Sequence, residues 1–561
     1  MTTTSPSVLI VGAGPTGLFH ALTLLRNGIP VRIIEKQDAF QVGTRGCGLQ
    51  PRTVEIYKLL GLLPDLLEVK ADPFPVFEFD SPQGSIEDTE GKAVPMIEEV
   101  ENTPSRPFNN GFMLMQERQE HLLRSAILRD YGVQVELSTE LRSFEEHEDH
   151  VIAHVVKISD GEEKSETIYA HFLVGADGGK STIRKQLGIE FVGDSSDAHS
   201  IGMVAGDIVG LEGTLDQKIW RLWGSPRDKK LSIRPCCVPG KNYLNFFLGG
   251  RNVDLDKVVS SRDVLLSTIH DITGRDDMKF GEVITMNIWR PNIRMVGSFG
   301  KGRVFIAGDA AHVHSPTGGQ GMNSGAQDAI NLGWKLALVD KNLAPKSILE
   351  SYTQERVPVI ASMLEMTTKL FNKTFKPSAD ETTADGMKRE YELRMFGVNY
   401  RKSPIVVDER YTYTDEDTVD PYRSGDDGTV RAGDRAPDAP QLSQLSPVAQ
   451  STTFFDIFSP AYHTVLIFTH PGEETEKIIH RASRFPKDIV KTVLVLPQSS
   501  STSITSAADI VVVDTEGFAF KHYMIEDKNL PTFVIVRPDG FIGGLVHGAE
   551  GLRKYFNIVL L

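Results

Sequence analysis

Short apolar runs that end in glycine recur along this chain. Val8–Val11 is such a run, and apolar positions spaced three and four residues apart then predict a helix to about Asn27. Val31–Glu35 follows as a second strand that ends in an acidic residue. A strand, a glycine turn, a helix and another strand are typical of the first unit of a doubly wound, parallel α/β sheet.

The same order of elements returns twice. Phe172–Gly175 runs into a glycine turn and a helix, and Val304–Ala307 leads through a glycine-rich loop into a helix over about 322–338. A helix that begins on glycines presents unpaired N–H groups and the positive end of its dipole. We therefore expect an anionic group in front of the helix that begins near Met322.

Two stretches break this α/β pattern. Residues 190–295 contain short alternating runs typical of an antiparallel sheet, and residues 73–112 are rich in proline, charge and aromatic side chains. We expect both to be insertions that form a substrate domain within an α/β domain covering residues 1–405. The strands expected in the longer insertion are Gly202–Ile208, Ile219–Leu222, Leu231–Ile233 and Tyr243–Leu248.

The C-terminal part reads as a separate unit. Residues 406–435 have few long apolar runs and are expected to be a linker, although 408–411 could instead lie along the first domain. Residues 436–561 alternate strands with helical or loop segments, and 530–540 resembles the proline-containing strand and hairpin of thioredoxin-like domains. No cysteine follows Cys237, which excludes disulfide exchange, so we expect a structural or oligomeric role and take a homodimer as the candidate assembly.

Composition narrows the functional class. The 561-residue chain has a formal net charge of -15 and a pI of about 5.5, which argues against nucleic acid or an anionic membrane as a partner. Its three cysteines show no metal-binding spacing, so no metal is expected, and they fit a reduced, cytoplasmic setting. No stretch of eighteen uninterrupted apolar residues predicts a membrane span.

The N-terminal turn carries the first candidate chemistry. Its glycines allow a tight turn and the close approach of a pyrophosphate, and the acid at the end of the second strand can accept a hydrogen bond from a ribose. A glutamate in this place suits an unphosphorylated ribose, which favours FAD or NAD over NADP as the cofactor. The residues expected to bind this cofactor are Gly12, Ala13, Gly14, Pro15, Thr16, Gly17, Glu35 and Lys36.

The loop that starts at Gly308 gives a more specific signal. The run 308–312, GDAAH, followed by Pro316 and by 318–323, GGQGMN, resembles the second flavin motif of class A FAD-dependent aromatic monooxygenases of the phenol hydroxylase type. Gln116 with Glu120 and the DG motif at Asp177 resemble further motifs of that family, in the family's order. The resemblance, with the thioredoxin-like tail, covers nearly the whole chain.

This resemblance implies a fold and a cofactor. The fold is a Rossmann-type FAD-binding domain of the p-hydroxybenzoate hydroxylase kind, with an antiparallel substrate domain. FAD is bound, and NADPH or NADH binds transiently as the reductant. The further FAD contacts that it implies are Arg45, Gln116, Asp177, Gly308, Asp309, Pro316, Gly319, Gly321, Met322 and Asn323. For the Asp177 carboxylate we expect Arg184 as an ionic partner.

Two positions depart from the family pattern. The family carries an aspartate that helps to deprotonate the phenol where this chain has Cys47, and a tyrosine that binds the phenolate where it has Trp289. Cys47 could be a weak base or a small packing residue, and Trp289 could stack on a substrate or belong to the core. The resemblance makes Arg45, Cys47, Trp289 and Pro316 the candidate catalytic residues.

The activity that the resemblance implies is hydroxylation of a phenolic or polyketide-derived aromatic substrate by NAD(P)H and O2, through a flavin hydroperoxide. The two departures keep a second reading open, in which the same oxidant serves a Baeyer–Villiger, epoxidising or dearomatising reaction on a related polycyclic substrate. A non-catalytic flavin-type fold is a third reading, and the intact glycines at 318–323 argue against it.

Overall fold

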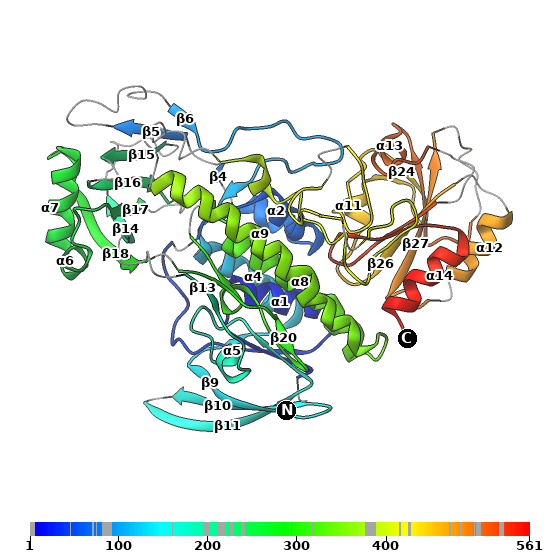
Figure 1. Ribbon diagram of the computed structural model, residues 1–561, viewed down its shortest axis with the longest axis horizontal. Helices are drawn as coiled ribbons and strands as arrows, with labels where there is room; N and C mark the ends of the chain where they lie inside the picture. The colour runs from blue at the N-terminus through cyan, green and yellow to red at the C-terminus, as the bar shows by residue number, and fades with distance from the viewer. Residues whose placement is uncertain are drawn as a thin grey trace.

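The computed structural model shows three parts joined side by side (Figure 1). It describes residues 6–44, 46–69, 72–73, 76–80, 93–159, 161–194, 202–210, 219–224, 228–236, 242–290, 292–315, 318–375, 389–414, 417–424, 428–469, 473–482, 485–498, 500, 506–526 and 532–561. No helix among these residues is long and apolar enough to cross a membrane.

The central part is built on a six-stranded sheet in the order β20-β21-β12-β1-β2-β8. Its inner strands are parallel and, apart from Arg32 of β2, apolar, as expected for a sheet with helices on both faces. The predicted strand, turn, helix and strand at the N-terminus are β1, α1 and β2. The strands are β1 (Val8–Val11), β2 (Val31–Ile34), β8 (Val135–Glu136), β12 (Phe172–Gly175), β20 (Gly300–Lys301) and β21 (Val304–Ile306).

Two helices that follow glycine turns pack directly on one another. Helix α1 (Pro15–Arg26) meets α8 (Gly321–Asp340) at two glycines of α8, where a side chain would collide. A Cβ at Gly325 would lie 2.2 Å from Thr16 Oγ1, and one at Gly333 would lie 2.5 Å from Thr23 Cγ2. These close contacts bring the N-termini of both helices to the same end of the sheet.

Further elements complete this part. The helices are α2 (Pro51–Leu59), α3 (Leu63–Glu68), α4 (Gln116–Tyr131), α5 (Thr182–Gln186), α9 (Glu350–Phe375), η2 (Gly308–Ala310), η3 (Lys346–Leu349) and η4 (Tyr391–Arg394). The small sheets contain β3 (Gly48–Leu49), β4 (Asp72–Pro73), β7 (Phe112–Met113), β9 (Thr139–Glu146), β10 (Val151–Ser159), β11 (Glu162–Ala170), β13 (Val192–Asp194), β19 (Ile293–Met295) and β22 (His312–Val313).

The second part is the predicted inserted sheet. Seven strands lie in the order β18-β14-β17-β16-β15-β5-β6, and an apolar core joins one face to α6 (Leu255–Ser260) and α7 (Arg262–Thr273). Both expected insertions contribute, since β5 and β6 come from the first. The strands are β5 (Val76–Asp80), β6 (Ala93–Pro95), β14 (Met203–Gly210), β15 (Ile219–Gly224), β16 (Lys230–Pro235), β17 (Tyr243–Gly249) and β18 (Phe280–Trp289).

The third part holds an eight-stranded sheet in the order β23-β30-β29-β26-β27-β28-β24-β25. Its strands are β23 (Val407–Asp408), β24 (Leu442–Ser446), β25 (Gln450–Thr452), β26 (His463–Phe468), β27 (Val490–Pro497), β28 (Ile510–Asp514), β29 (Thr532–Val536) and β30 (Ile542–His547). Its helices are α11 (Phe454–Ile457), α12 (Glu473–Ala482), α13 (Phe518–His522) and α14 (Gly548–Val559).

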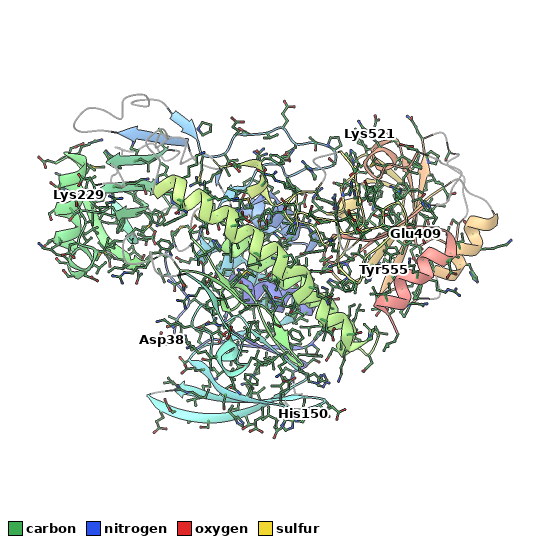
Figure 2. All side chains as sticks on the ribbon, in the orientation of Figure 1. Asp38, His150, Lys229, Glu409, Lys521 and Tyr555 are labelled. Atoms are coloured by element: carbon green, nitrogen blue, oxygen red, sulfur yellow. The ribbon has the colours of Figure 1, made fainter. Side chains whose placement is uncertain are left out.

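The described start of the 406–435 segment is packed against this third sheet. Its strand β23 pairs in parallel with β30, and Glu409 accepts a hydrogen bond from the backbone N–H of His547 at 2.6 Å. Figure 2 labels Glu409 in this third part, and a Cβ at Gly551 of α14 would lie 2.9 Å from the Glu409 carboxylate oxygens. The expected thioredoxin-like strand and hairpin begin at 530–531, which lie outside the described residues.

A buried ionic network joins the third part to the central part. Glu355 of α9 binds Arg537 of the third part, at 2.7 and 3.0 Å, and Lys335 of α8, at 2.7 Å. The Trp334 indole of α8 donates to Asp539 at 3.2 Å. Burial raises the pKa of Glu355, but the two cations outweigh burial and the pKa lies below its ordinary range. Helix α8 is thus bonded both to α9 and to the third part of the molecule.

Candidate active site

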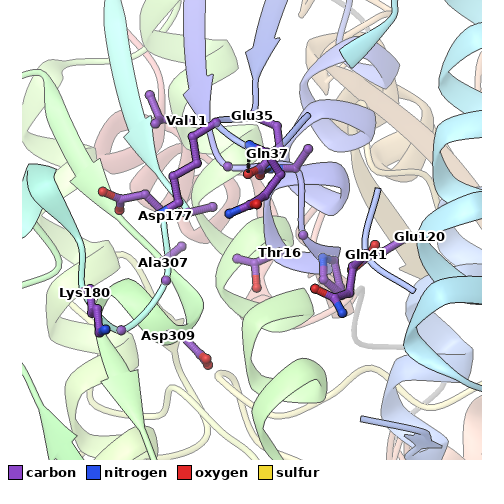
Figure 3. A pocket seen from close by; sticks show the side chains of 18 of the residues that line it. Val11, Thr16, Glu35, Gln37, Gln41, Glu120, Asp177, Lys180, Ala307 and Asp309 are labelled. Atoms are coloured by element: carbon purple, nitrogen blue, oxygen red, sulfur yellow. Dashed lines mark hydrogen bonds between the residues drawn. The ribbon is translucent and has the colours of Figure 1, made fainter. Parts of the chain in front are cut away.

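A cavity of about 640 Å³ opens where β1, β2 and β12 end and α1 and α8 begin. Figure 3 shows Thr16, Glu35, Asp177 and Asp309 around this one space. The carboxyl ends of parallel strands are the usual binding edge of an open α/β sheet. Among the predicted cofactor residues, those that line the cavity are Gly12, Ala13, Gly14, Pro15, Thr16, Glu35, Lys36, Gln116, Asp177, Asp309, Gly321 and Met322.

The glycines of the N-terminal turn have different structural roles. Gly12 has φ +102°, and a Cβ there would lie 2.2 Å from the Ala176 carbonyl oxygen. A Cβ at Gly17 would lie 2.0 Å from the Gly12 oxygen, so these two glycines fix the turn itself. Gly14 differs, because its φ of -69° suits any residue and no described atom lies within 4 Å of its Cβ position. The space in front of Gly14 is therefore available to a ligand.

Glu35 ties the second strand to this turn. Its Oε2 accepts from the Ala13 N–H at 3.0 Å and its Oε1 accepts from the Gln37 N–H at 3.1 Å. A carboxylate has further lone pairs, so Glu35 can still accept a hydrogen bond from a ribose hydroxyl within the cavity. Lys36 and Lys180, which also line the cavity, supply positive charge near the same edge.

Asp177 is positioned differently from the prediction. Its Oδ2 accepts from the Thr182 and Ile183 N–H groups at 2.7 and 3.3 Å, so it caps the first turn of α5. The expected ion pair with Arg184 is wrong, because that guanidinium donates to the carbonyl oxygens of Ala310 and Gly179 at 2.8 and 2.9 Å. The other oxygen, Asp177 Oδ1, is buried and has no hydrogen-bond partner among the described residues.

The loop around Gly308 is held by a buried cluster that the sequence patterns did not reveal. Asp328 of α8 accepts from the Gly308 N–H at 2.9 Å, His312 Nε2 at 2.8 Å and Arg356 Nε at 2.7 Å, and all three side chains are buried. Burial raises the pKa of Asp328, but Arg356 and His312 lower it by a larger amount. The pKa therefore lies below its ordinary range, and the carboxyl stays ionised. A Cβ at Gly308, where φ is +57°, would lie 2.5 Å from Thr16 Oγ1.

The N-terminus of α8 is joined to the segment after Cys47. Asn323 donates to the Gly48 oxygen at 2.8 Å and accepts from the Gln50 N–H at 2.9 Å. No side chain in the described part of the chain caps this helix. The first-turn N–H groups of α8 therefore point into the cavity that Gly321 and Met322 line. Gly319, with φ +62°, lies in the turn just before the helix.

The candidate catalytic residues lie at the boundary with the inserted sheet. Cys47 is half-buried, and its carbonyl oxygen accepts from the Leu114 N–H at 2.6 Å. Trp289 ends β18, pairs with Met203 and lies 6.5 Å from the Phe371 ring of α9, measured between ring centroids. Arg45 and Pro316 lie outside the described residues, so their expected roles stay predictions.

The cavity fits an elongated dinucleotide such as FAD. One end has the open space at Gly14, and the other has the uncapped N-terminus of α8. Asp177 and Asp309 also line the cavity, and carboxylate oxygens can accept hydrogen bonds from hydroxyl groups of such a ligand. Helix N-termini at both ends suit a pyrophosphate and an anionic ring system.

Comparison with known proteins gives the family. The model of the FAD binding domain family matches residues 5–367, and the chain belongs to this family. A flavin-dependent monooxygenase of Mycobacteroides abscessus is 32% identical over 556 residues, covering 98% of this chain and 99% of that protein. Pentachlorophenol 4-monooxygenase of Sphingobium chlorophenolicum is 30% identical over 564 residues, covering 98% and 94%. This chain is accordingly a flavoprotein monooxygenase, an oxidoreductase that uses FAD.

Solved structures agree with this fold. The ternary complex of aklavinone-11 hydroxylase with FAD and aklavinone is 25% identical, with a TM-score of 0.77 over 99% of both chains. The flavin-dependent monooxygenase PieE, in complex with FAD and substrate, has a TM-score of 0.76 over 100% of both chains at 21% identity. The predicted FAD-binding α/β fold is confirmed.

Proposed function

We propose that this enzyme hydroxylates a phenolic or polyketide-derived aromatic substrate, using FAD, O2 and NADPH or NADH. The observation that carries the proposal is the single cavity in which both predicted flavin motifs meet, beside an inserted sheet. Proteins similar to this chain include an enzyme named for pentachlorophenol and, among solved structures, a hydroxylase in complex with aklavinone. No observation favours the Baeyer–Villiger, epoxidising or dearomatising alternative over hydroxylation.

The chain's own residues would bind and orient the cofactor. Gly14 leaves room for the pyrophosphate, Glu35 accepts from the adenosine ribose, and Asp177 and Asp309 accept from ribityl hydroxyls. The N–H groups of Gly321, Met322 and Asn323 would stabilise negative charge on the ring edge. Bound FAD supplies the one-electron chemistry that lets O2 react with a closed-shell aromatic compound.

The site roles taken from the family resemblance are part of this proposal. Gln116 lines the cavity and donates to Glu120 at 2.8 Å, which orients it for a cofactor contact. Arg45 and Pro316 would border the flavin ring, and Trp289 would form a wall of the substrate space. Cys47 would lie close to the substrate without acting as a strong base.

We also infer that residues 436–561 form a thioredoxin-like domain. In support, β27, β26, β29 and β30 lie side by side as a mixed sheet, with α12 and α14 packed together. Without cysteines this domain would have a structural or oligomeric role, and a cytoplasmic homodimer is the assembly that we infer.

The test is a panel of phenols and polyphenolic polyketides offered to the purified, FAD-loaded protein. We expect NAD(P)H oxidation to accelerate with a substrate and to yield a product heavier by one oxygen atom with its ring intact. Ring expansion to a lactone would instead indicate Baeyer–Villiger chemistry. Stoichiometric hydrogen peroxide with every compound would overturn the proposal.

A further inference from the structure

A row of polar residues crosses the inserted sheet on the face opposite α6 and α7. Asp207 of β14 is paired with Thr285 of β18 and with Asn245 of β17, which is paired with Arg234 of β16. Residues that alternate with them along the strands, such as Ile208 and Ile233, belong to the apolar core beneath the helices. The row therefore faces the flavin-binding part.

Asp207 has its acceptor capacity taken up within the protein. It accepts from the Thr44 N–H at 2.6 Å, Thr285 Oγ1 at 3.0 Å, Asn245 Nδ2 at 3.1 Å and Cys236 Sγ at 3.4 Å. Its burial is complete. Burial and then Asp207 raise the pKa of the Cys236 thiol, which keeps that thiol protonated as a donor. The Asp207 carboxylate is therefore a fixed structural acceptor.

Arg234 has the opposite character. It is buried, with 4% of its surface exposed, and its Nε donates to Asn245 Oδ1 at 3.0 Å. Within the described part of the chain, this is the only oxygen to which the guanidinium donates, and no carboxylate forms an ion pair with it. The guanidinium also lies 4.9 Å from the centroid of the Trp220 ring. A buried cation normally has an anionic partner, because taking an unpaired charge out of water is unfavourable.

The neighbour of Arg234 toward the flavin is Cys47. Burial lowers the pKa of Arg234, but electrostatic interactions with the nearby Cys47 and Cys236 raise it overall. The next residue after Cys47 is Gly48, which Asn323 of α8 holds at 2.8 Å. The segment from Cys47 to Gly48 thus connects the guanidinium to the helix N-terminus proposed for the flavin ring.

We propose that Arg234 binds the ionised oxygen of the substrate, which selects the phenolate form of a phenol. This inference rests on the proposed function. A phenol that binds here gives its proton to solvent, and the guanidinium holds the resulting anion, so no carboxylate base is needed at position 47. The absence of the family aspartate, which the sequence left unexplained, follows from this arrangement. An aspartate at 47 would pair with Arg234 and occupy its free donors.

The test uses 4-nitrophenol, because its ionised form absorbs visible light and reports its own protonation state when bound. Difference spectra against the FAD-loaded enzyme without ligand give both the dissociation constant and the pH midpoint of the bound phenol. We expect this midpoint to lie about 1 to 3 pH units below that of free 4-nitrophenol, as for an acid placed beside a cation. Nitrobenzene, which lacks the oxygen, should bind without dependence on Arg234.

Two substitutions give the decisive comparison. Arg234→Met keeps the volume and should weaken 4-nitrophenolate binding about 10- to 100-fold, the range for hydrogen bonds to charged groups, and raise the midpoint to the free value or above. Arg234→Lys should restore part of the downward shift. Bound FAD and circular dichroism check that each variant is folded.

A matched control is Arg221→Met on the adjacent strand β15. Arg221 lies two residues before Trp223, which belongs to the helix-covered core, so both residues are on that face of the sheet. Arg234 lies on the other face. This control should leave the midpoint unchanged. An unshifted midpoint in the parent enzyme, or one equally shifted in Arg234→Met, would overturn the inference. Retained FAD with substrate-stimulated NAD(P)H oxidation would then leave the proposed function standing.

Discussion

Two glycines of the N-terminal turn should respond differently to the same substitution, one through the stability of the fold and the other through FAD affinity alone. Gly12→Ala places a residue at φ +102° with its Cβ 2.2 Å from the Ala176 oxygen. Gly14→Ala keeps an ordinary φ of -69°, and its Cβ meets no described atom within 4 Å. The first change disturbs the protein, whereas the second enters only the space proposed for the pyrophosphate.

The magnitudes follow from these contacts. An unfavourable backbone conformation at position 12 lowers the free energy of unfolding by about 1–3 kcal/mol, and the clash with a carbonyl oxygen lowers it by an amount of similar size. At position 14, a small loss of helix capping is offset by lower entropy of the unfolded chain, so the apoprotein should change by less than about 1 kcal/mol. A methyl group at the pyrophosphate should weaken FAD binding at least about tenfold, which equals about 1.4 kcal/mol.

The assay separates the two effects. Urea denaturation of the FAD-free protein measures stability, and FAD fluorescence during reconstitution measures affinity. We expect Gly12→Ala to lose both stability and FAD affinity, and Gly14→Ala to lose only FAD affinity. The reasoning is refuted if Gly14→Ala binds FAD as tightly as the parent, or if it destabilises the apoprotein as much as Gly12→Ala does.

Three further predictions concern buried charge. Glu355→Gln leaves the buried Lys335 without a carboxylate and Arg537 with Asp539 alone, so denaturation should show a loss of about 3–5 kcal/mol, and proteolysis should begin at the junction with the third part; parental resistance to protease would contradict this. Asp328→Asn should cost a similar amount and flatten the acid limb of stability, because a depressed carboxyl pKa stabilises the fold above about pH 4 and that contribution is lost on further acidification. Burial and Arg537 lower the pKa of His463 to about 3, so the unfolded chain takes up the proton first, and stability should fall by up to about 1.4 kcal/mol per pH unit as the pH drops from about 6.5. His463→Phe should make the unfolding midpoint less sensitive to pH between about 6 and 4, and an unchanged slope would count against the assignment.

Much of this architecture was predictable because it depends on local patterns. Val8–Val11 and Val304–Ile306 are short apolar runs before glycine turns, and each forms a buried parallel strand at the binding edge. The inserted sheet was predictable from alternation, and the structure finds its strands within a few residues of the expected bounds. The helix from about 322 to 338 is α8, which begins one residue earlier and ends two residues later.

Contacts between distant residues could not be read from the sequence. Asp328 lies on the predicted helix, but only the folded chain brings it to Gly308 and Arg356. Spacing along the chain predicts a pairing of Asp177 with Arg184, yet the carbonyl oxygens of Ala310 and Gly179 accept from the guanidinium instead. Arg234 shows the same limit, because its place beside Cys47 depends on strand register and on how the flavin part meets the sheet.

The most direct test of the central claim is oxygen labelling. The FAD-loaded enzyme is supplied with NADPH or NADH, a phenol that it turns over, and 18O2, and the product is analysed by mass spectrometry. The account predicts one atom of 18O on the aromatic ring of each product molecule, with at most minor release of labelled peroxide. A product whose new oxygen comes from water, or complete conversion of the label into peroxide, would contradict it.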